Sequence, residues 1–368
     1  MIASLHQLKQ QKRALIRAYA KADDREGLRQ VVVTVAPLVI AWGFAAWSLH
    51  VSLWLTAAAT VAICVLLIRV FSLMHECGHG CLFRKPSLNR GVGFLFGVLT
   101  GMPQYVWSQH HLYHHQTNGN WDRYRGARAT LTLQEYEKLS GLQQRLYRWT
   151  RHVAFSPVAG FVYLIFNPRF NWMRGSVSLL IHLASGKPSA TFRTRLWKNF
   201  REYRHQSANN AVLLAAWALM GWALGPAAFF AIYLTSLSLS GAVGIALFTV
   251  QHNFEHSCAS DEAGWDIDAG AITGTSFLIL PGWINWATAN IGYHHIHHLS
   301  SMIPGYALPQ CHEEYRELFA GVRRITLGQV PAHLKCILWD TAAGRIITVR
   351  EYRQQRAALP AVALTTAA

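Results

Sequence analysis

The sequence predicts an all-α integral-membrane protein in which two transmembrane helical hairpins support a cytoplasmic helical cap. Two observations favour this fold class. Hydrophobic residues make up 52% of the 368 residues and charged residues only 14%, whereas a soluble protein of this length normally carries more charge. In addition, two long stretches contain no Asp, Glu, Lys or Arg. Each is long enough to cross a hydrocarbon core of about 30 Å twice, so we expect four passes.

The first charge-free stretch runs from Val31 to Ile68. We expect it to form a hairpin over about residues 31–70, with its turn near His50. The preceding residues 1–30 are polar and basic for longer than the start of a cleavable signal peptide. Because basic segments beside membrane passes stay in the cytoplasm, we expect His75 and His79 to follow the second helix on the cytoplasmic side.

The second charge-free stretch runs from His205 to Phe254 and contains a Gly225-Pro226 break near its middle. It predicts a hairpin over about residues 207–251. This hairpin returns His252 to the cytoplasmic side. Residues 31–308 are thus expected to form the membrane domain, and residues 309–368 a cytoplasmic C-terminal tail that is poorly ordered beyond about Ala357.

Three further apolar pieces are shorter or are interrupted by proline: residues 91–102, 153–166 and 271–289. The first two fall short of the roughly 20 residues that a pass needs, and we expect all three to be interfacial or re-entrant segments. Six passes is the alternative to four.

The net charge of +16 would suggest nucleic acid as a partner of a soluble protein. Here the basic residues avoid both hairpins and gather in residues 1–30 and 121–205, as expected for cytoplasmic segments. No recognition motif accompanies them, so we expect no nucleic-acid binding. The six cysteines form no CxxC pair and are expected to be reduced, structural thiols.

Three histidine clusters carry the chemistry: HECGHG at residues 75–80, HHLYHH at 110–115 and HHIHHL at 294–299. The i, i+4 spacing of His75 and His79 places both rings on one helix face. The other two clusters each contain HxxHH, and each of these triplets can converge on one or two metals. Gathering eight imidazoles at one membrane face costs free energy unless a cation holds them neutral, so the clusters predict metal binding.

The number and type of ligands narrow the choice of metal. A single zinc ion needs only four ligands, so eight imidazoles imply two metal ions. An all-nitrogen site with two metals suits iron or copper, and iron is favoured for activating O2 beside a C–H bond.

The order HxxxH, HxxHH and a late HxxHH, interleaved with two membrane hairpins, resembles the membrane fatty acid desaturase family, which includes related hydroxylases. The resemblance extends from about Phe71 to Leu308. Residues 107–126, WSQHHLYHHQTNGNWDRYRG, and residues 292–308, GYHHIHHLSSMIPGYAL, look like the bacterial acyl-lipid desaturase branch.

The family also places a ligand in a Gln-His pair at the end of the last transmembrane helix, which matches Gln251-His252 here. The resemblance therefore implies two iron ions (Fe2+) held by nine ligands: His75, His79, His111, His114, His115, His252, His294, His297 and His298. His110, His256 and His295 fall outside the pattern. Residues expected to orient ligands from behind are Glu76, Asp122, Glu255, Asn290 and His256.

The implied function is an O2-dependent desaturase that introduces a double bond into a fatty acyl chain carried by a lipid, by coenzyme A or by acyl carrier protein. The sequence has no GxGxxG in a βαβ pattern, no CxxC clusters and no fused haem domain. A separate electron donor such as a ferredoxin, rubredoxin or cytochrome is therefore expected. The expected location is the bacterial inner membrane, with the clusters on the cytoplasmic side.

Three alternatives remain open at this stage. A membrane hydroxylase of an alkane, sterol or carotenoid would begin with the same hydrogen abstraction. His75-Glu76-Cys77-Gly78-His79 also reads HExxH, the motif of zinc peptidases, although a peptidase would leave both HxxHH triplets without a role. A metal transporter would place its ligands inside the membrane helices. The sequence does not specify the double-bond position, the acyl carrier or the oligomeric state.

Overall fold

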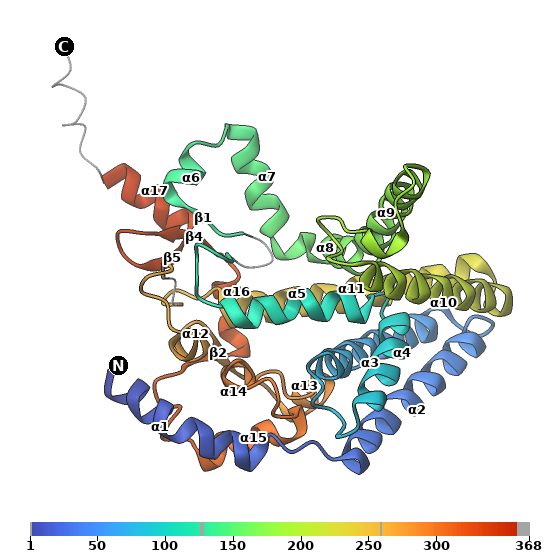
Figure 1. Cartoon of the computed structure of the whole chain (residues 1–368), viewed down its shortest axis with the longest axis horizontal. Helices are drawn as coiled ribbons and strands as arrows, with labels where there is room; N and C mark the ends of the chain where they lie inside the picture. Colours follow the sequence, from blue (N-terminus) through green and yellow to red (C-terminus); the bar gives the residue numbers. More distant parts are fainter. Residues whose placement is uncertain (1, 126–128, 258–259, 359–368) are drawn as a thin grey trace.

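The computed structural model describes residues 2–125, 129–257 and 260–358, most of which lie in helices (Figure 1). In this described part, five helical segments are long and apolar enough to cross a membrane. They are α2 (Asp24–Ser48), α3 (Leu53–His79), the run Val153–Ala184, α10 (Phe200–Leu224) and α11 (Pro226–His252). The predicted all-α membrane fold is confirmed, while the number of passes stays a prediction.

The first hairpin consists of α2 and α3, which pack against each other, and α3 also packs against α4 (Pro86–Leu99). The Asp23 side chain caps α2 by accepting hydrogen bonds from the backbone N–H groups of Arg25 and Glu26. α3 ends at Gly80, whose φ of 74° is a left-handed conformation that a side chain disfavours. The helix therefore stops directly after His79.

The second hairpin turns at Gly225, with a φ of 80°, and Pro226 opens α11. This confirms the predicted break, because proline is tolerated in a first helical turn but not inside a helix. α11 approaches the short helix α8 (Ser156–Phe161) closely, since a β-carbon on Gly241 would lie 2.6 Å from Cα of Gly160. Glycine at both positions allows this contact.

The run Val153–Ala184 differs from the sequence prediction of a short segment over residues 153–166. η1 (Val153–Phe155) and α8 continue through a π-helical turn, η2 (Val162–Phe166), into α9 (Asn167–Ala184). Pro168 does not interrupt the run, because it lies in the first turn of α9. The helix is therefore long enough for a pass. This length is not evident from the sequence, because the arginines after residue 166 interrupt the apolar stretch.

The other two short apolar pieces form no spanning helix within the described residues. Residues 91–102 lie in α4 and the turn after it. Residues 271–289 are divided among α12 (Ile267–Thr273), β2 (Ser276–Ile279) and α13 (Gly282–Ala287).

The remaining elements build the cap around the inner ends of the hairpins. Its helices are α1 (Ile2–Tyr19), α5 (Gln104–Thr117), α6 (Leu133–Glu137), α7 (Gly141–Arg151), α14 (His294–Leu299), α15 (Leu308–Glu314), α16 (Val330–His333) and α17 (Val349–Ala358), with short turns η3 (Ser189–Thr191), η4 (Gly305–Ala307) and η5 (Leu327–Gln329). Within the described residues, two small sheets complete the cap. β1 (Leu131–Thr132) pairs in parallel with β4 (Cys336–Asp340), which pairs antiparallel with β5 (Arg345–Thr348), and β2 pairs in parallel with β3 (Arg323–Thr326).

These sheets draw residues 309–358 onto the cap, although the sequence assigns them to a tail. β3 pairs with β2 and β4 pairs with β1, and both partner strands lie in earlier parts of the chain. Residues 309–358 therefore pack against the cap and do not form a separate tail. The domain boundary at residue 308 stays a prediction. The expected poor order of the C-terminus concerns mainly residues 359–368, which lie outside the described residues.

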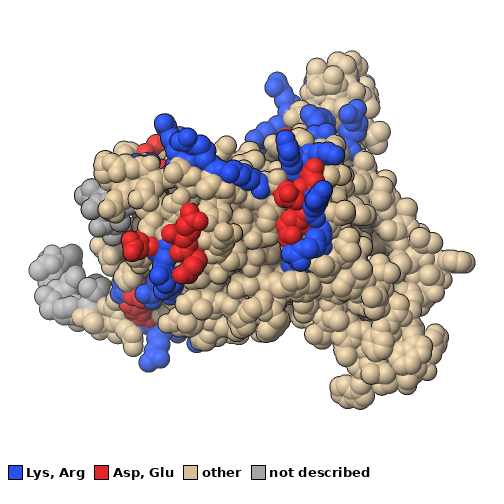
Figure 2. Space-filling view, turned by 90° about the horizontal axis from the view of Figure 1, so that it is seen from below, with Lys and Arg blue, Asp and Glu red and all other residues tan. Residues whose placement is uncertain are grey.

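Charged side chains are distributed unevenly over the surface. In Figure 2 they gather over the left and middle of the molecule, and the right-hand end is tan. The two hairpins turn at that end in Figure 1. The uncharged end agrees with burial of the hairpins in a membrane.

Candidate metal centre

The inner ends of α3 and α11 meet α5 and α14, and this meeting brings together all nine histidines that the sequence predicts as ligands. Their ring nitrogens form two groups, in each of which the nitrogens lie within 4.8 Å of one another. The first group is His75, His79, His111, His115 and His297, and the second is His114, His252, His294 and His298.

Helical spacing explains the membership of the two groups. His75 and His79 on α3, and His111 and His115 on α5, are i, i+4 pairs whose rings lie on one face of their helix. Both pairs belong to the first group. On α14 the i, i+4 pair His294 and His298 belongs to the second group. The third histidine of each HxxHH triplet points to the opposite group, since it is one residue away from the pair and so rotated by about 100°.

In the first group the Nε2 atoms form a chain of short contacts from ring to ring. The Nε2–Nε2 distances are 3.2 Å for His79–His75, 2.9 Å for His75–His111, 3.0 Å for His111–His115 and 3.1 Å for His115–His297. In the second group His252 is central, with its Nε2 3.2 Å from that of His114 and 2.8 Å from that of His294. The groups are adjacent, because the rings of His115 and His298 stack with centroids 4.1 Å apart.

The nitrogen spacing fits metal ions. With metal–nitrogen bonds of roughly 2.1 Å at right angles, neighbouring ligand nitrogens lie about 3.0 Å apart. At this distance two neutral imidazoles can share one hydrogen in an N–H···N hydrogen bond. A whole cluster of neutral imidazoles, however, cannot give every ring nitrogen a hydrogen-bond partner. Both ring nitrogens of the buried His298 have no hydrogen-bond partner among the described residues. A cation lets every Nε2 present its lone pair, so the residues fit two metal ions.

Burial also favours the form of these histidines that can bind metals. It holds the pKa of His111, His114, His115, His294, His297 and His298 well below the usual value, because charged imidazolium is poorly solvated there and neighbouring rings would repel it. A neutral imidazole has a free lone pair for coordination. The site is therefore ready to accept metal ions at neutral pH.

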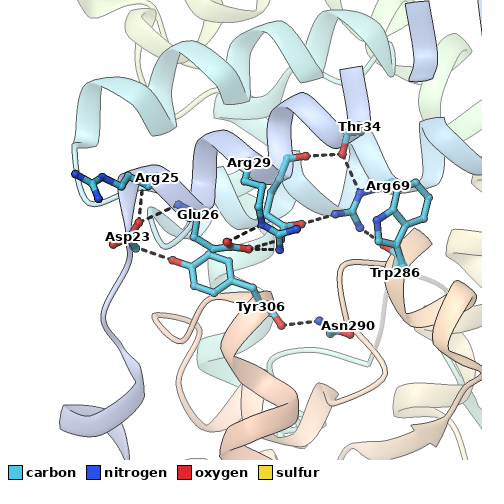
Figure 3. A network of polar contacts seen from close by, with 11 residues as sticks. Asp23, Arg25, Glu26, Arg29, Thr34, Arg69, Trp286, Asn290 and Tyr306 are labelled. Carbon is cyan, nitrogen blue, oxygen red and sulfur yellow. Dashed lines mark hydrogen bonds and ion pairs between the residues drawn. The ribbon is translucent and has the colours of Figure 1, made fainter. Parts of the chain in front are cut away.

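A polar network joins α2 and α3 to α13 and to the chain on either side of α14 (Figure 3). The Nε of Arg69 donates to Oγ1 of Thr34 at 2.8 Å, and its other nitrogens donate to the Gln30 side chain and the Trp286 carbonyl. The guanidinium also lies 4.3 Å from the centroid of the Trp286 ring. Arg69 thus fixes α13 against both helices of the first hairpin.

Two of the predicted orienting residues meet at Gly305, just after α14. The Glu76 carboxylate accepts a hydrogen bond from the Gly305 N–H at 2.9 Å, and the Asn290 amide donates to the Gly305 carbonyl at 3.0 Å. Neither side chain forms a hydrogen bond with a histidine ring among the described residues. They position the third cluster through the backbone, so their direct role behind a ligand stays a prediction.

The other predicted neighbours lie farther from the rings. Glu255 forms an ion pair with Arg345 at 2.9 Å, Asp122 accepts the backbone N–H of Glu262 at 2.9 Å, and His256 is exposed with its Nε2 3.8 Å from Glu255. His110 is also exposed. None of these four residues belongs to either histidine group, although His110 lines the cavity described below.

Three features escaped the sequence analysis. Gln251, known only as the partner of His252 in a motif, donates from its side chain to the Ile291 carbonyl at 2.7 Å and so ties α11 to the segment before α14. The Trp107 ring stacks on His111, with centroids 4.6 Å apart. His295, outside both groups, is buried with its Nε2 3.1 Å from Nδ1 of His312. No local motif marks His312, so only the fold reveals this pair.

A cavity of about 710 Å3 opens against the histidines, within the range of small-molecule sites. Two histidines of the first group, His75 and His111, and two of the second, His114 and His294, line it. The rest of the wall is mostly apolar and comes from α3, α8, η2 and α11, including Leu67, Phe71, Val162, Leu237, Ile245 and Phe248. The cavity can hold an apolar chain in contact with both groups.

Comparison with known proteins identifies the family. The sequence pattern of the family described as "Fatty acid desaturase" matches residues 52–327. A protein named "Fatty acid desaturase" from Bacillus subtilis (strain 168) is 33% identical over 348 residues, which cover 94% of this chain and 92% of that protein. The chain belongs to the fatty acid desaturase family. The resemblance inferred from the histidine clusters is confirmed.

More distant relatives carry related names. The "Omega-3 fatty acid desaturase, endoplasmic reticulum" of Vigna radiata is 24% identical over 83% of this chain and 76% of that protein. The "sn-1 oleoyl-lipid 12-desaturase" of a Picosynechococcus is 22% identical over 78% of this chain and 76% of that protein. This desaturase is accordingly a membrane oxidoreductase that acts on a fatty acyl lipid with O2.

The peptidase interpretation of residues 75–79 finds no support in the site. Its general base would be Glu76, but that carboxylate accepts the Gly305 N–H and is buried. His75 and His79 also share their group with three histidines of the HxxHH triplets, His111, His115 and His297, which a mononuclear zinc peptidase does not need.

Proposed function

We propose that this desaturase holds two iron ions, one in each histidine group, and inserts a double bond into an acyl chain that lies in the cavity. The observation that carries the proposal is the lining of one apolar cavity by histidines of both groups. When bound, iron would activate O2 as the oxidant that removes hydrogen from two adjacent, unactivated methylene groups.

The overall reaction must balance. One –CH2–CH2– unit, O2, two electrons and two protons give –CH=CH– and two water molecules. The two electrons come from a separate donor, for which a ferredoxin, rubredoxin or cytochrome is suitable. The donor docks on the cytoplasmic face of the bacterial plasma membrane, where basic residues outside the hairpins offer a complementary surface to an acidic protein.

The chain's own residues orient the substrate. The apolar wall excludes water and leaves an extended acyl chain little freedom to move. Because the chain is held in one position, one pair of its carbons is placed at the histidine groups and reacts there. Trp107 fixes part of this wall, because its Nε1 donates to the Tyr163 hydroxyl at 2.8 Å while its ring stacks on His111. The acyl chain is therefore held beside rings that cannot swing away.

Lipid analysis tests the activity. The desaturase is expressed in a host of defined lipid composition, and the position of any new double bond is found by mass spectrometry. A new unsaturated acyl chain that depends on both histidine groups supports the proposal. Appearance of a hydroxylated product with unchanged unsaturation would instead show that oxygen is transferred to the substrate.

Gly244 tests whether the cavity is the acyl site. It lines the cavity, and a β-carbon there would meet no atom within 4 Å. Gly244→Leu has room for its β-carbon and projects further atoms into the cavity, so it is expected to lower turnover of long acyl chains at least 10-fold while shorter chains lose less. Gly43→Leu, on α2 and equally open, is the matched control and should leave turnover unchanged. Equal activity of both variants would place the substrate elsewhere.

A further inference from the structure

The helix α7 displays an apolar stripe to the outside of the cap. Leu142, Leu146 and Trp149 follow one another at helical spacing, and Val153, which opens η1 after the extended residue His152, is also exposed. Their exposed fractions are 65%, 53%, 69% and 56%. Single exposed apolar residues are common on protein surfaces, but an aligned stripe on one helix marks an interaction surface.

The opposite face of α7 is firmly packed, so the outward direction of the stripe is fixed. Tyr147 is buried against the β1-β4-β5 sheet, where its hydroxyl donates to the Ile337 carbonyl at 2.6 Å and accepts from the Leu131 N–H at 3.1 Å. The guanidinium of Arg151 lies 3.6 Å from the centroid of the Tyr147 ring. The helix cannot rotate to hide Trp149 without breaking these contacts.

A basic groove runs between α7 and α17, beside the stripe. It is lined by Arg148, Arg350 and Arg353, together with Val349, Gln354 and Ala357. The acids nearby are already paired, since Glu137 binds Arg356 at 2.6 Å and Glu351 binds Arg345. None of the three groove arginines has an ion-pair partner within the described residues. The groove therefore offers three unneutralised guanidinium groups, the group that best matches a phosphate.

The position of α7 relates both features to the membrane. Only His152 separates α7 from the candidate span Val153–Ala184, which starts with η1, so the C-terminal end of α7 lies where that run begins. In Figure 1, α7 is drawn at a steep angle to α10 and α11, as expected for a helix that lies across the direction of the passes. Val158 and Phe166, which lie in this run, are also exposed apolar residues.

We propose that α7 is an interfacial helix whose stripe rests in the headgroup layer, and that the groove beside it binds the phosphate of an anionic phospholipid. An amphipathic helix with Trp and Leu on one face and basic residues at its edge is the usual design for such a position. A bilayer covers both the stripe and the groove. An acidic redox protein would neutralise the groove and leave Trp149 and Leu146 in water, so the lipid surface accounts for more of what is seen.

Native mass spectrometry of the full chain tests the groove. The detergent-solubilised protein is titrated with phosphatidylglycerol, and with phosphatidylcholine for comparison. The variant Arg148→Gln/Arg350→Gln/Arg353→Gln is expected to retain phosphatidylglycerol about 100-fold more weakly than the wild type, because each basic residue contributes appreciably to anionic lipid binding. Phosphatidylcholine retention should not change.

The matched control is Arg13→Gln/Arg17→Gln/Lys21→Gln, which removes three exposed cations on and just after α1. It should retain phosphatidylglycerol like the wild type. Equal loss in both variants would mean that net charge alone matters, and no loss in the groove variant would overturn the site. A groove variant with unchanged lipid retention but a raised KM for the electron donor would assign the groove to a protein partner.

Spin labels in nanodiscs test the stripe independently. A label on Leu146→Cys is expected to be more accessible to O2 than to a water-soluble nickel chelate, because O2 concentrates in the bilayer. A label on Lys138→Cys, an exposed residue just before α7, should show the reverse order. The wild-type protein taken through the same labelling gives the background from native cysteines. Preference of the Leu146 label for the nickel chelate would contradict an interfacial α7.

Discussion

The two histidine groups are adjacent but are held together in different ways. The first group takes four of its five rings from i, i+4 pairs on α3 and α5, and its Nε2 atoms form an unbroken chain of contacts. The second group has only one such pair and depends on single residues of α5 and α11, His114 and His252. Local helix geometry builds most of the first group, whereas the second exists only when α11 docks correctly.

Their supports differ in the same way. α3 contributes only to the first group, and Glu76 ties it to Gly305 after α14. α11 contributes only to the second group, and Gln251 ties it to Ile291 before α14. α14 contributes to both groups. The Glu76 bond anchors α3 and should therefore matter chiefly for the first group, and the Gln251 bond anchors α11 and should matter chiefly for the second.

The largest expected effect is the removal of one ligand from either group. His79→Ala and His298→Ala should each lower desaturation more than about 100-fold, beyond the range seen for residues behind a ligand. Iron content should fall from about two ions per chain to about one, because the other group remains complete. Metal analysis of the purified variants, together with circular dichroism as a folding control, checks this. Loss of both ions in either variant would show that the groups do not bind independently.

Glu76→Ala is expected to come next. It leaves the buried Gly305 N–H without an acceptor, which costs about 1–3 kcal/mol. In a His298→Ala background, where only the first group can load, it should remove most of the remaining iron, and in a His79→Ala background much less. Glu76→Gln keeps an acceptor oxygen and should restore loading. If Gln behaves like Ala, the charge of Glu76 rather than its hydrogen bond is what matters.

Gln251→Leu tests the anchor of α11 and therefore the second group. It keeps the bulk of the side chain but removes the donor to the Ile291 carbonyl, at a cost of about 1 kcal/mol. Iron should now be lost from the second group, which is measured in the His79→Ala background, and be retained by the first. The same loss from both groups would refute a separate anchor for α11.

The smallest effect on iron loading is expected at Asn290, which anchors neither α3 nor α11. Its φ of 61° is left-handed, a conformation that costs most residues roughly 1–2 kcal/mol and that asparagine and glycine tolerate. Asn290→Ala should lower the unfolding temperature slightly, and Asn290→Gly should lower it less, with equal iron loss from both groups. Thermal unfolding in detergent measures this. A loss confined to one group would mean that Asn290 touches a ligand directly.

The sequence by itself determined the fold class, both hairpin turns and eight of the nine histidines that meet, whereas His252 was expected only from the family resemblance. These features are local or compositional: charge-free stretches need a membrane, Gly225-Pro226 ends a helix, and i, i+4 spacing places rings on one face. Residues 153–166 were misjudged because the arginines after residue 166 end the apolar run in sequence, although the helix continues to Ala184.

Tertiary structure alone decided how each HxxHH triplet divides between the groups. Consecutive residues on a helix point about 100° apart, so the direction in which His114 or His297 meets a partner depends on how α5 and α14 are rotated against α3 and α11. That rotation is set by long-range bonds such as Glu76–Gly305 and Gln251–Ile291, which join residues far apart in the chain. The exposed stripe of α7 is likewise visible only once Tyr147 is seen to occupy the inner face.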